Sequence, residues 1–213
     1  MYRPPLFRED RLDVLHTAIS HHPLATLVTA GANGLMANHI PFLINPAGSA
    51  NGVLRAHLAR ANDQLVDLRA GAEALVIFQG PETYITPSWY ASKAEHGKVV
   101  PTWNYVMVQA RGRLQVHEDA PWLLSLVTRL TQRHEAALPR PWAVADAPAD
   151  FIDGMLRAIV GIEIPLDALI GKWKVSQNRS TADREGVAAG LREQGAASDG
   201  ASVNMSKLVQ PGG

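Results

Sequence analysis

The clearest pattern in the chain is an alternation of apolar and polar residues between positions 106 and 117. Val106, Val108, Ala110, Gly112, Leu114 and Val116 fall on one face, and Met107, Gln109, Arg111, Arg113, Gln115 and His117 fall on the other. A period of two predicts a half-buried β-strand. A strand this long must bend to stay within a compact domain, and we expect the bend at Gly112.

The remaining hydrophobic pattern predicts further strands and helices around this one. Helices are expected at 11–21, 63–70, 121–134, 149–156 and 183–193, and strands at 24–29, 35–44, 53–58, 74–78 and 158–164. The segment 31–34, Gly-Ala-Asn-Gly, predicts a hairpin turn, and a second turn follows at 45–52. Short strands joined by tight turns indicate an antiparallel sheet or barrel, so the expected class is mainly β with flanking helices. We expect one domain over residues 1–192 and a flexible tail over 193–213, where the residues are small and polar.

The segment 81–105 is unusually aromatic. It contains five of the nine Trp and Tyr residues of the chain, and prolines at 81, 87 and 101 argue against a long helix or a central strand. A segment this aromatic is expected to fold against the rest of the protein, because otherwise it would expose a large apolar patch. Two interpretations follow: the segment fastens a barrel or a dimer together, or it forms the wall of a pocket for a planar cofactor.

Composition narrows the class of protein. The chain has 213 residues, with 20 basic and 20 acidic side chains, so its net charge gives no general attraction for nucleic acid or an anionic membrane. The absence of cysteine excludes a disulfide, a Cys-ligated zinc and a thiolate nucleophile. No signal peptide or apolar run of membrane-spanning length is present, which predicts a cytoplasmic protein without a membrane partner.

Motifs for common chemistry are missing, but two cationic segments stand out. The histidines lack metal-ligand spacing, so no metal site is expected, and no Rossmann, P-loop or hydrolase motif occurs. A strand running into a helix at 53–64 carries Arg55, His57, Arg60 and Asn62, which either bind a phosphate at the helix start or form a solvated corner. Lys98, with Thr102 and Asn104 nearby, forms a second such segment inside the aromatic region. Together these offer what a flavin mononucleotide (FMN) needs: a phosphate grip, hydrogen-bonding groups and flat apolar surface.

Several longer motifs resemble one family. They are MYRPPLF, HPLATLVT, GLMANHIPFL, LRAHLARAN, PETYITPSWY, GKVVPTWNY, RGRLQVHED and IVGIEIPLDALIGKWKVSQNR, and they span roughly residues 1–190 in order. The sequence resembles the PaiB family of FMN-binding negative transcriptional regulators. The resemblance implies a six-stranded split β-barrel of the pyridoxamine-phosphate-oxidase-like type, FMN as the cofactor, and a homodimer with two FMN sites at the subunit interface.

The resemblance also implies a set of cofactor-binding residues. These are Asn38, His39, Arg55, His57, Arg60, Asn62, Lys98, Thr102, Trp103, Asn104, Lys172 and Gln177, with Lys174 as a further candidate for the phosphate or a substrate. The neighbouring Trp173 either touches a ligand or anchors the carboxyl-terminal segment.

Three functions are compatible with this fold. The first is regulation, with DNA as the partner, although no helix-turn-helix is evident and basic residues cluster only at Arg111/Arg113 and Arg129/Arg133. The second is an FMN-dependent oxidoreductase. The third is a haem-binding protein with His39, His57 or His96 as axial ligand.

Overall fold

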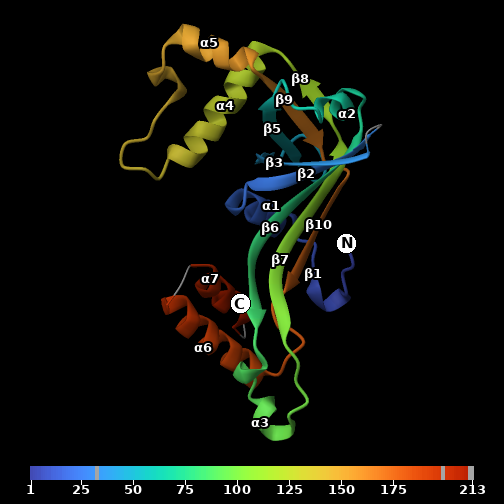
Figure 1. Cartoon of the computed structure of the whole chain (residues 1–213), viewed down its shortest axis with the longest axis vertical. Coiled ribbons are helices and arrows are strands. Elements are labelled where there is room, and N and C mark those ends of the chain that lie inside the picture. The colour runs from blue at the N-terminus through green and yellow to red at the C-terminus, as the bar shows by residue number, and fades with distance from the viewer. Residues whose placement is uncertain (32–33, 198–199, 211–213) are drawn as a thin grey trace. The chain divides into compact units, whose positions relative to one another are not determined.

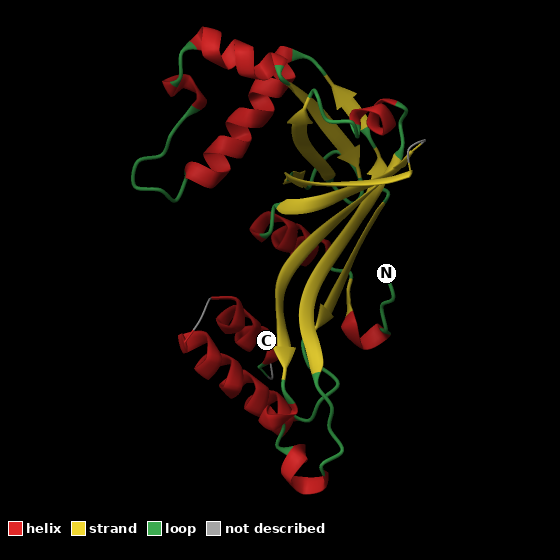
Figure 2. Cartoon of the chain, in the orientation of Figure 1, coloured by secondary structure: helices red, strands yellow, loops and turns green. Residues whose placement is uncertain are grey.

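The computed structural model describes residues 1–31, 34–197 and 200–210, and its sheets and helices are drawn in Figures 1 and 2. A six-stranded sheet has the order β1-β10-β7-β6-β2-β3, and a four-stranded sheet has the order β4-β5-β9-β8. The larger sheet comprises β1 (Arg8–Glu9), β10 (Ala168–Lys174), β7 (Thr102–Arg113), β6 (Glu73–Ile85), β2 (Leu24–Gly31) and β3 (Gly34–Pro41). The smaller comprises β4 (Leu43–Asn45), β5 (Val53–Ala59), β9 (Ile159–Pro165) and β8 (Gln115–His117).

Seven α-helices accompany the sheets within the described residues. They are α1 (Leu12–His21), α2 (Leu65–Arg69), α3 (Ser92–His96), α4 (Ala120–Glu135), α5 (Ala149–Arg157), α6 (Thr181–Ala197) and α7 (Gly200–Val209). The ladders β1–β10, β2–β3, β2–β6, β4–β5, β5–β9 and β8–β9 are all antiparallel. The predicted class, mainly antiparallel β with flanking helices, is confirmed. None of the helices in the described ranges combines the length and hydropathy needed to cross a lipid bilayer.

The chain divides into two compact units, and β6 and β7 each contribute residues to both of them. The first unit comprises Met1–Leu15, Gln79–Val108 and Ile170–Gly213, and the second comprises His16–Phe78 and Gln109–Leu169.

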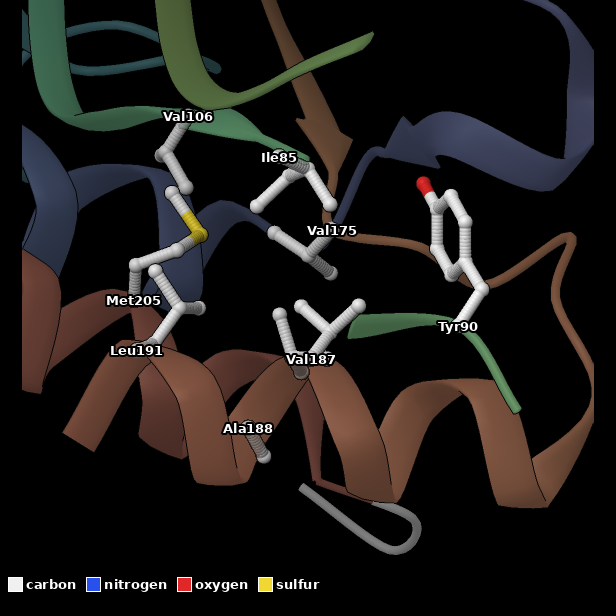
Figure 3. Close-up of a cluster of buried hydrophobic side chains, with 9 residues drawn as sticks. Ile85, Tyr90, Val106, Val175, Val187, Ala188, Leu191 and Met205 are labelled. Carbon is white, nitrogen blue, oxygen red and sulfur yellow. The ribbon is translucent and has the colours of Figure 1, made fainter. Parts of the chain in front are cut away.

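The core of the first unit joins the aromatic segment to the two carboxyl-terminal helices. The buried side chains of Ile85, Tyr90, Val106, Val175, Val187, Ala188, Leu191, Met205 and Val209 form one cluster, most of which Figure 3 shows as sticks. Trp89 packs beside this cluster on two glycines of α6. A Cβ at Gly190 would lie 2.4 Å from the Trp89 ring, and one at Gly186 would lie 2.1 Å from the Trp89 carbonyl oxygen. Part of the aromatic segment therefore fastens α6 in place, whereas the first interpretation had it fasten a barrel or a dimer.

The core of the second unit lies between its strands and helices. Phe42 and Phe78 meet edge to face with ring centroids 5.8 Å apart, and Leu27, Leu54 and Ile164 of the same unit are also fully buried. The helix α4 contacts β5 and β9, and its Trp122 occupies the space above Gly161, where a Cβ would lie 2.2 Å from the indole ring. Since only glycine fits there, this glycine sets how closely the helix approaches the sheet.

Several predicted boundaries differ from the structure. The expected strand 35–44 is interrupted at Phe42, and the expected strand 106–117 is interrupted at Leu114, two residues beyond the expected bend. At Gly112 the backbone approaches Pro165 closely, since a Cβ would lie 2.1 Å from the Pro165 carbonyl oxygen. Ala32 and Asn33, in the predicted hairpin turn, lie outside the described residues.

Pro81 was expected to exclude a central strand, but β6 runs through it. The neighbouring strand β2 pairs with β6 only from Ala74 to Ile77. Pro81 therefore lies beyond the segment that β2 pairs with, where a missing N–H costs no hydrogen bond to that neighbour.

The carboxyl-terminal residues differ most from the prediction of a flexible tail over 193–213. The helix α6 continues to Ala197, and α7 follows with Met205 and Val209 fully buried in the cluster of the first unit. Residues 198–199 and 211–213 of this predicted tail lie outside the described residues. Small residues that read as a tail in the sequence instead allow two helices to pack closely, as at Gly195, where a Cβ would lie 2.7 Å from the Val203 side chain.

Candidate functional site

A cavity of about 610 Å³ opens on one face of the sheet in the first unit. Its lining consists of Met1, Tyr2, Gln79, Glu82, Trp103, Tyr105, Val106, Met107 and Lys172. The alternation along β7 explains this lining, because successive side chains point to opposite faces of a strand. Asn104 and Val108 are buried in the core, whereas Trp103, Tyr105 and Met107 occupy the alternate positions that line the cavity; Val106 is buried and also borders the cavity. We call this cavity the aromatic pocket.

Lys172 is the main cation of the aromatic pocket. Its ammonium lies 5.6 Å from the centroid of the Tyr2 ring and 5.2 Å from that of Tyr105, so it interacts with two aromatic faces. The residue is only 8% exposed. Within residues 1–31, 34–197 and 200–210 its ammonium has neither a hydrogen bond nor an ion pair. Most of the side chain is thus buried, while its ammonium faces the pocket between the two rings.

The neighbouring Lys174 is in a different situation. Its ammonium donates a hydrogen bond to the Thr102 hydroxyl, 2.5 Å away, and another to the carbonyl oxygen of Trp103. Burial lowers the pKa of Lys174, and the positive charges of Lys172 and Arg179 lower it further. Lys174 and Thr102 thus fix the beginning of β7 to β10.

Two other predicted contacts in the first unit hold a turn. The buried amide of Asn104 donates to the Ser176 hydroxyl, 2.9 Å away, while its own carbonyl oxygen has no partner among the described residues. Gln177 closes the same turn, since its carbonyl oxygen accepts from the Val175 N–H and its amide donates to the Trp173 carbonyl. Ser176 has φ 67°, a left-handed conformation that these bonds stabilise.

Lys98 lies in the loop after α3, where its side chain is exposed and its backbone N–H donates to the His96 ring at 3.0 Å. Of the predicted residues, the structure therefore brings Trp103 and Lys172 together in the aromatic pocket. Thr102, Asn104 and Gln177 belong to the strand and turn that support it.

The predicted residues of the second unit form separate groups. The Asn38 amide donates to the side-chain carbonyl of Gln64 at 2.8 Å, and the Asn62 side chain accepts from the Gln64 N–H at 3.0 Å. Gln64 is fully buried and also donates to the Thr29 hydroxyl, which in turn donates to Asp67. This network fastens α2 to the sheet, and sequence reasoning missed its centre, Gln64.

Arg55 and His57 lie on the four-stranded sheet, beneath Trp122. Arg55 forms an ion pair with Glu163 at 2.5 Å, and its guanidinium lies 6.0 Å from the Trp122 ring. His57 stands opposite Gly161, and burial lowers the pKa of its imidazole. The Nδ1 atom of His57 is buried without a hydrogen-bond partner among the described residues.

On the opposite side of Gly161 stands His117, whose ring stacks on Trp122 with centroids 4.2 Å apart. Its Nε2 atom is also buried without a partner in the described chain. The sequence offered no signal for this residue beyond its place at the end of the alternating segment.

The guanidinium of Arg60 is occupied by hydrogen bonds and an ion pair within the protein. It donates to the carbonyl oxygens of Arg157 and Ile159 and forms an ion pair with Glu118 at 2.8 Å. Hydrogen bonds from Arg60 and then Arg69 lower the pKa of Glu118. His39 is exposed, and its ring lies 3.3 Å from the Thr26 hydroxyl. The described contacts of Arg60 are thus those of a structural corner.

Comparisons of sequence connect the chain to known proteins. An uncharacterized protein of Emericella nidulans is 33% identical over 230 residues, covering 92% of this chain and 92% of its own. The protease synthase and sporulation protein PAI 2 of Bacillus subtilis is 27% identical, covering 91% of this chain and 90% of its own.

Solved structures agree on the fold. The FAD and heme binding protein from Mycobacterium smegmatis matches with a TM-score of 0.57 at 18% identity, covering 86% of this chain and 80% of its own. The flavocytochrome Anf3 from Azotobacter vinelandii matches with a TM-score of 0.55 at 14% identity, covering 79% of this chain and 69% of its own. At such identities these likenesses establish the fold, the split barrel of flavin-binding proteins, and nothing further.

The model of one protein family, described as "Putative FMN-binding domain", matches residues 1–168, which is more than three quarters of the chain. The similarity to the Bacillus protein agrees with the resemblance to PaiB that the sequence motifs indicated. The chain therefore belongs to the FMN-binding domain family that this model describes, and its cofactor is FMN.

Proposed function

We propose that this chain is an FMN-binding regulator of the PaiB type whose flavin ring lies in the aromatic pocket. The observation that carries the proposal is the pocket itself, in which flat aromatic rings flank a lysine ammonium that has no acceptor in the described chain. Its volume of about 610 Å³ falls within the range of roughly 300–1,000 Å³ that is usual for cofactor sites. These residues fit a flavin, which is planar, largely apolar on its faces and polar along one edge.

Each lining residue has a distinct task in this proposal. Trp103 and Tyr105 offer surfaces on which a flat ring can stack, and Tyr2 covers the pocket from the amino-terminal arm. Glu82 accepts a hydrogen bond from the Gln79 amide at 2.6 Å, so these two side chains form a polar rim. FMN, when bound, supplies electron-transfer chemistry, while the protein sets its position and surroundings.

The amino-terminal arm is held firmly enough to serve as a wall. Arg3 forms an ion pair with Asp10 at 2.6 Å, and it also donates to the carbonyl oxygen of Gly171 at 3.3 Å. The short strand β1 then pairs with β10, placing Arg8 opposite Lys172. Tyr2 therefore approaches Lys172 from a segment that is attached to the same strand.

A titration with FMN tests the site. Trp103→Ala removes a half-exposed ring, so the fold should survive, and we expect FMN to bind about 10–100-fold more weakly, as stacking of a flat ring is worth about 1–3 kcal/mol in nucleobase complexes. Trp142→Ala, which removes a similarly exposed ring in the second unit, is the control and should leave the affinity unchanged. Absence of saturable FMN binding to the wild-type chain would refute the proposal.

The regulatory part of the proposal is supported by similarity to the sporulation protein of Bacillus subtilis and by the PaiB resemblance. We expect specific binding to DNA upstream of its own coding region, and we expect FMN to alter the affinity. A gel-shift assay with and without FMN measures this, using a scrambled fragment of equal length as the control. Equal retention of both fragments at low salt would remove DNA binding from the proposal.

An FMN-dependent oxidoreductase is the second candidate, favoured by the size and exposure of the aromatic pocket. Tyr2 is 82% exposed and Trp103 is 55% exposed, so a second planar molecule has access to a ring bound between them. We expect NAD(P)H consumption by the FMN-loaded protein if this candidate is correct. The absence of turnover with either nicotinamide would leave regulation as the proposal.

A further inference from the structure

The aromatic pocket contains a cation that nothing in the described chain neutralises. Lys172 is only 8% exposed, yet its ammonium contacts two tyrosine rings and no carboxylate. Glu82, the acid in the lining, is exposed and is hydrogen-bonded to Gln79 instead, and it forms no ion pair with Lys172 within 4.0 Å. An ammonium that faces a pocket between two aromatic rings, without an acceptor in the described chain, is available to a ligand that supplies a negative or electron-rich group.

The neighbouring Lys174 differs from Lys172, because its ammonium has acceptors within the protein. Two residues along the same strand, the Lys174 ammonium is already bound to the Thr102 hydroxyl and the Trp103 carbonyl. Lys174 therefore has acceptors within the protein, whereas Lys172 has only ring faces. Of these two lysines, only Lys172 lines the pocket.

The surroundings of Lys172 do not suit a phosphate group. A phosphate dianion is normally held by several donors, such as a guanidinium, clustered backbone N–H groups or a helix amino terminus. The side chains of the lining offer one ammonium, one amide already hydrogen-bonded to Glu82, and aromatic rings. A single donor set between two aromatic faces instead suits the edge of a planar ring that carries carbonyl oxygens, since the ring can stack while one oxygen accepts from the ammonium.

We infer that Lys172 binds the carbonyl-bearing edge of the flavin ring and that the FMN phosphate lies outside the aromatic pocket. This inference rests on the proposed function, because it assumes that the flavin occupies this pocket. Tyr2 and Tyr105 position the ammonium, and the ammonium supplies positive charge to the ring edge. Such a charge favours the ring that has gained electrons, so Lys172 also raises the reduction potential of bound flavin.

Riboflavin, which has the same ring and no phosphate, separates the two possible roles of Lys172. We would titrate FMN and riboflavin into the wild-type chain, Lys172→Met, Lys172→Arg and the exposed control Lys207→Met. We expect Lys172→Met to weaken both flavins by the same factor, about tenfold or more, the loss typical of a hydrogen bond to a charged group. Lys172→Arg should retain part of the affinity, and Lys207→Met should bind both flavins with wild-type affinity.

The midpoint potential of bound flavin is the second measurement, which a purely structural role would not move. Lys172→Met is expected to weaken the preference of the site for reduced over oxidised flavin. Each tenfold loss of that preference lowers the midpoint potential of this two-electron couple by about 30 mV. A loss confined to FMN would overturn the inference in favour of phosphate binding, and unchanged affinities for both flavins would overturn it outright. Failure of the wild-type chain to bind either flavin would instead refute the proposed function on which the inference rests.

Discussion

At the scale of single residues, two helical glycines that look alike in the sequence have opposite surroundings. Gly190 of α6 faces the Trp89 ring, and a Cβ there would lie 2.4 Å from it. Gly154 of α5 is open, because the nearest atom to its Cβ position is 3.9 Å away in the Arg157 side chain. We expect Gly190→Ala to destabilise the protein by about 1–3 kcal/mol through overpacking, and Gly154→Ala to stabilise it by about 0.5–1 kcal/mol through helix propensity. Urea denaturation of both variants measures the difference, and equal effects would contradict this account.

The charged residues of the second unit show that a sequence reveals which chemical groups are present better than it reveals which groups they contact. The family resemblance implied Arg55, His57 and Arg60 as flavin contacts, and their charge near a helix start suggested a phosphate site. A sequence does not reveal that Arg55 meets Glu163 or that Arg60 meets Glu118. Such pairs join residues that are 108 and 58 positions apart. Only the strand register that places Arg55 opposite Glu163 makes the first pair visible.

Asp183, near the start of α6, ties that helix to α3 and gives the stability of this region a pH dependence. Burial opposes its ionisation, but hydrogen bonds from the backbone and hydroxyl of Ser92, both 2.9 Å long, outweigh burial and lower the pKa of its carboxyl group. A lowered folded-state pKa contributes stability above the unfolded-state value, about 3.9, and this stability is lost as the pH falls through the folded-state value. We expect Asp183→Asn to lower the Tm near neutral pH and to reduce its dependence on pH below about 4. Parallel Tm curves for variant and wild type would contradict this tie.

At the scale of elements, strands were predicted more reliably than the carboxyl terminus. The alternation that defines β7 is visible because one face of the strand is buried and the other is not. The helix α7 is rich in small and polar residues, so the hydrophobic pattern was too weak to predict it. Its order comes from packing against α6 and the buried cluster, which are contacts that only the fold provides.

Met205 tests whether α7 is an integral part of the first unit. It is fully buried in the cluster of Figure 3, whereas Lys207, two residues along the same helix, is exposed. We expect Met205→Ala to reduce the free energy of unfolding by about 2–5 kcal/mol, the usual cost of such a cavity, and Lys207→Ala to have little effect. Circular dichroism during urea denaturation measures both changes. A neutral Met205→Ala would mean that the segment is a tail after all.

At the scale of the whole molecule, the exposed aromatic residues of the first unit raise the question of what covers them in solution. Trp103 and Tyr84 meet edge to face with centroids 6.0 Å apart, and both side chains are about half exposed, next to the more exposed Tyr2. Exposed apolar groups that cluster in this way are typical of interaction surfaces. The PaiB resemblance implies a homodimer with its flavin sites at the subunit interface, and we propose that a second copy of the chain covers this cluster.

This proposal predicts both a mass and a variant that changes it. Light scattering after gel filtration should give twice the 23.0 kDa of one chain. Tyr84→Glu places a charge in the cluster without altering the lining of the aromatic pocket, and we expect it to raise the dimer dissociation constant by about tenfold or more, because an unpaired charge resists burial. Glu95→Lys, which changes an exposed charge in α3, serves as the control and should remain dimeric. If both variants and the wild type have the mass of one chain at all concentrations, the cluster serves the flavin alone, and each chain holds its cofactor without help from a second copy.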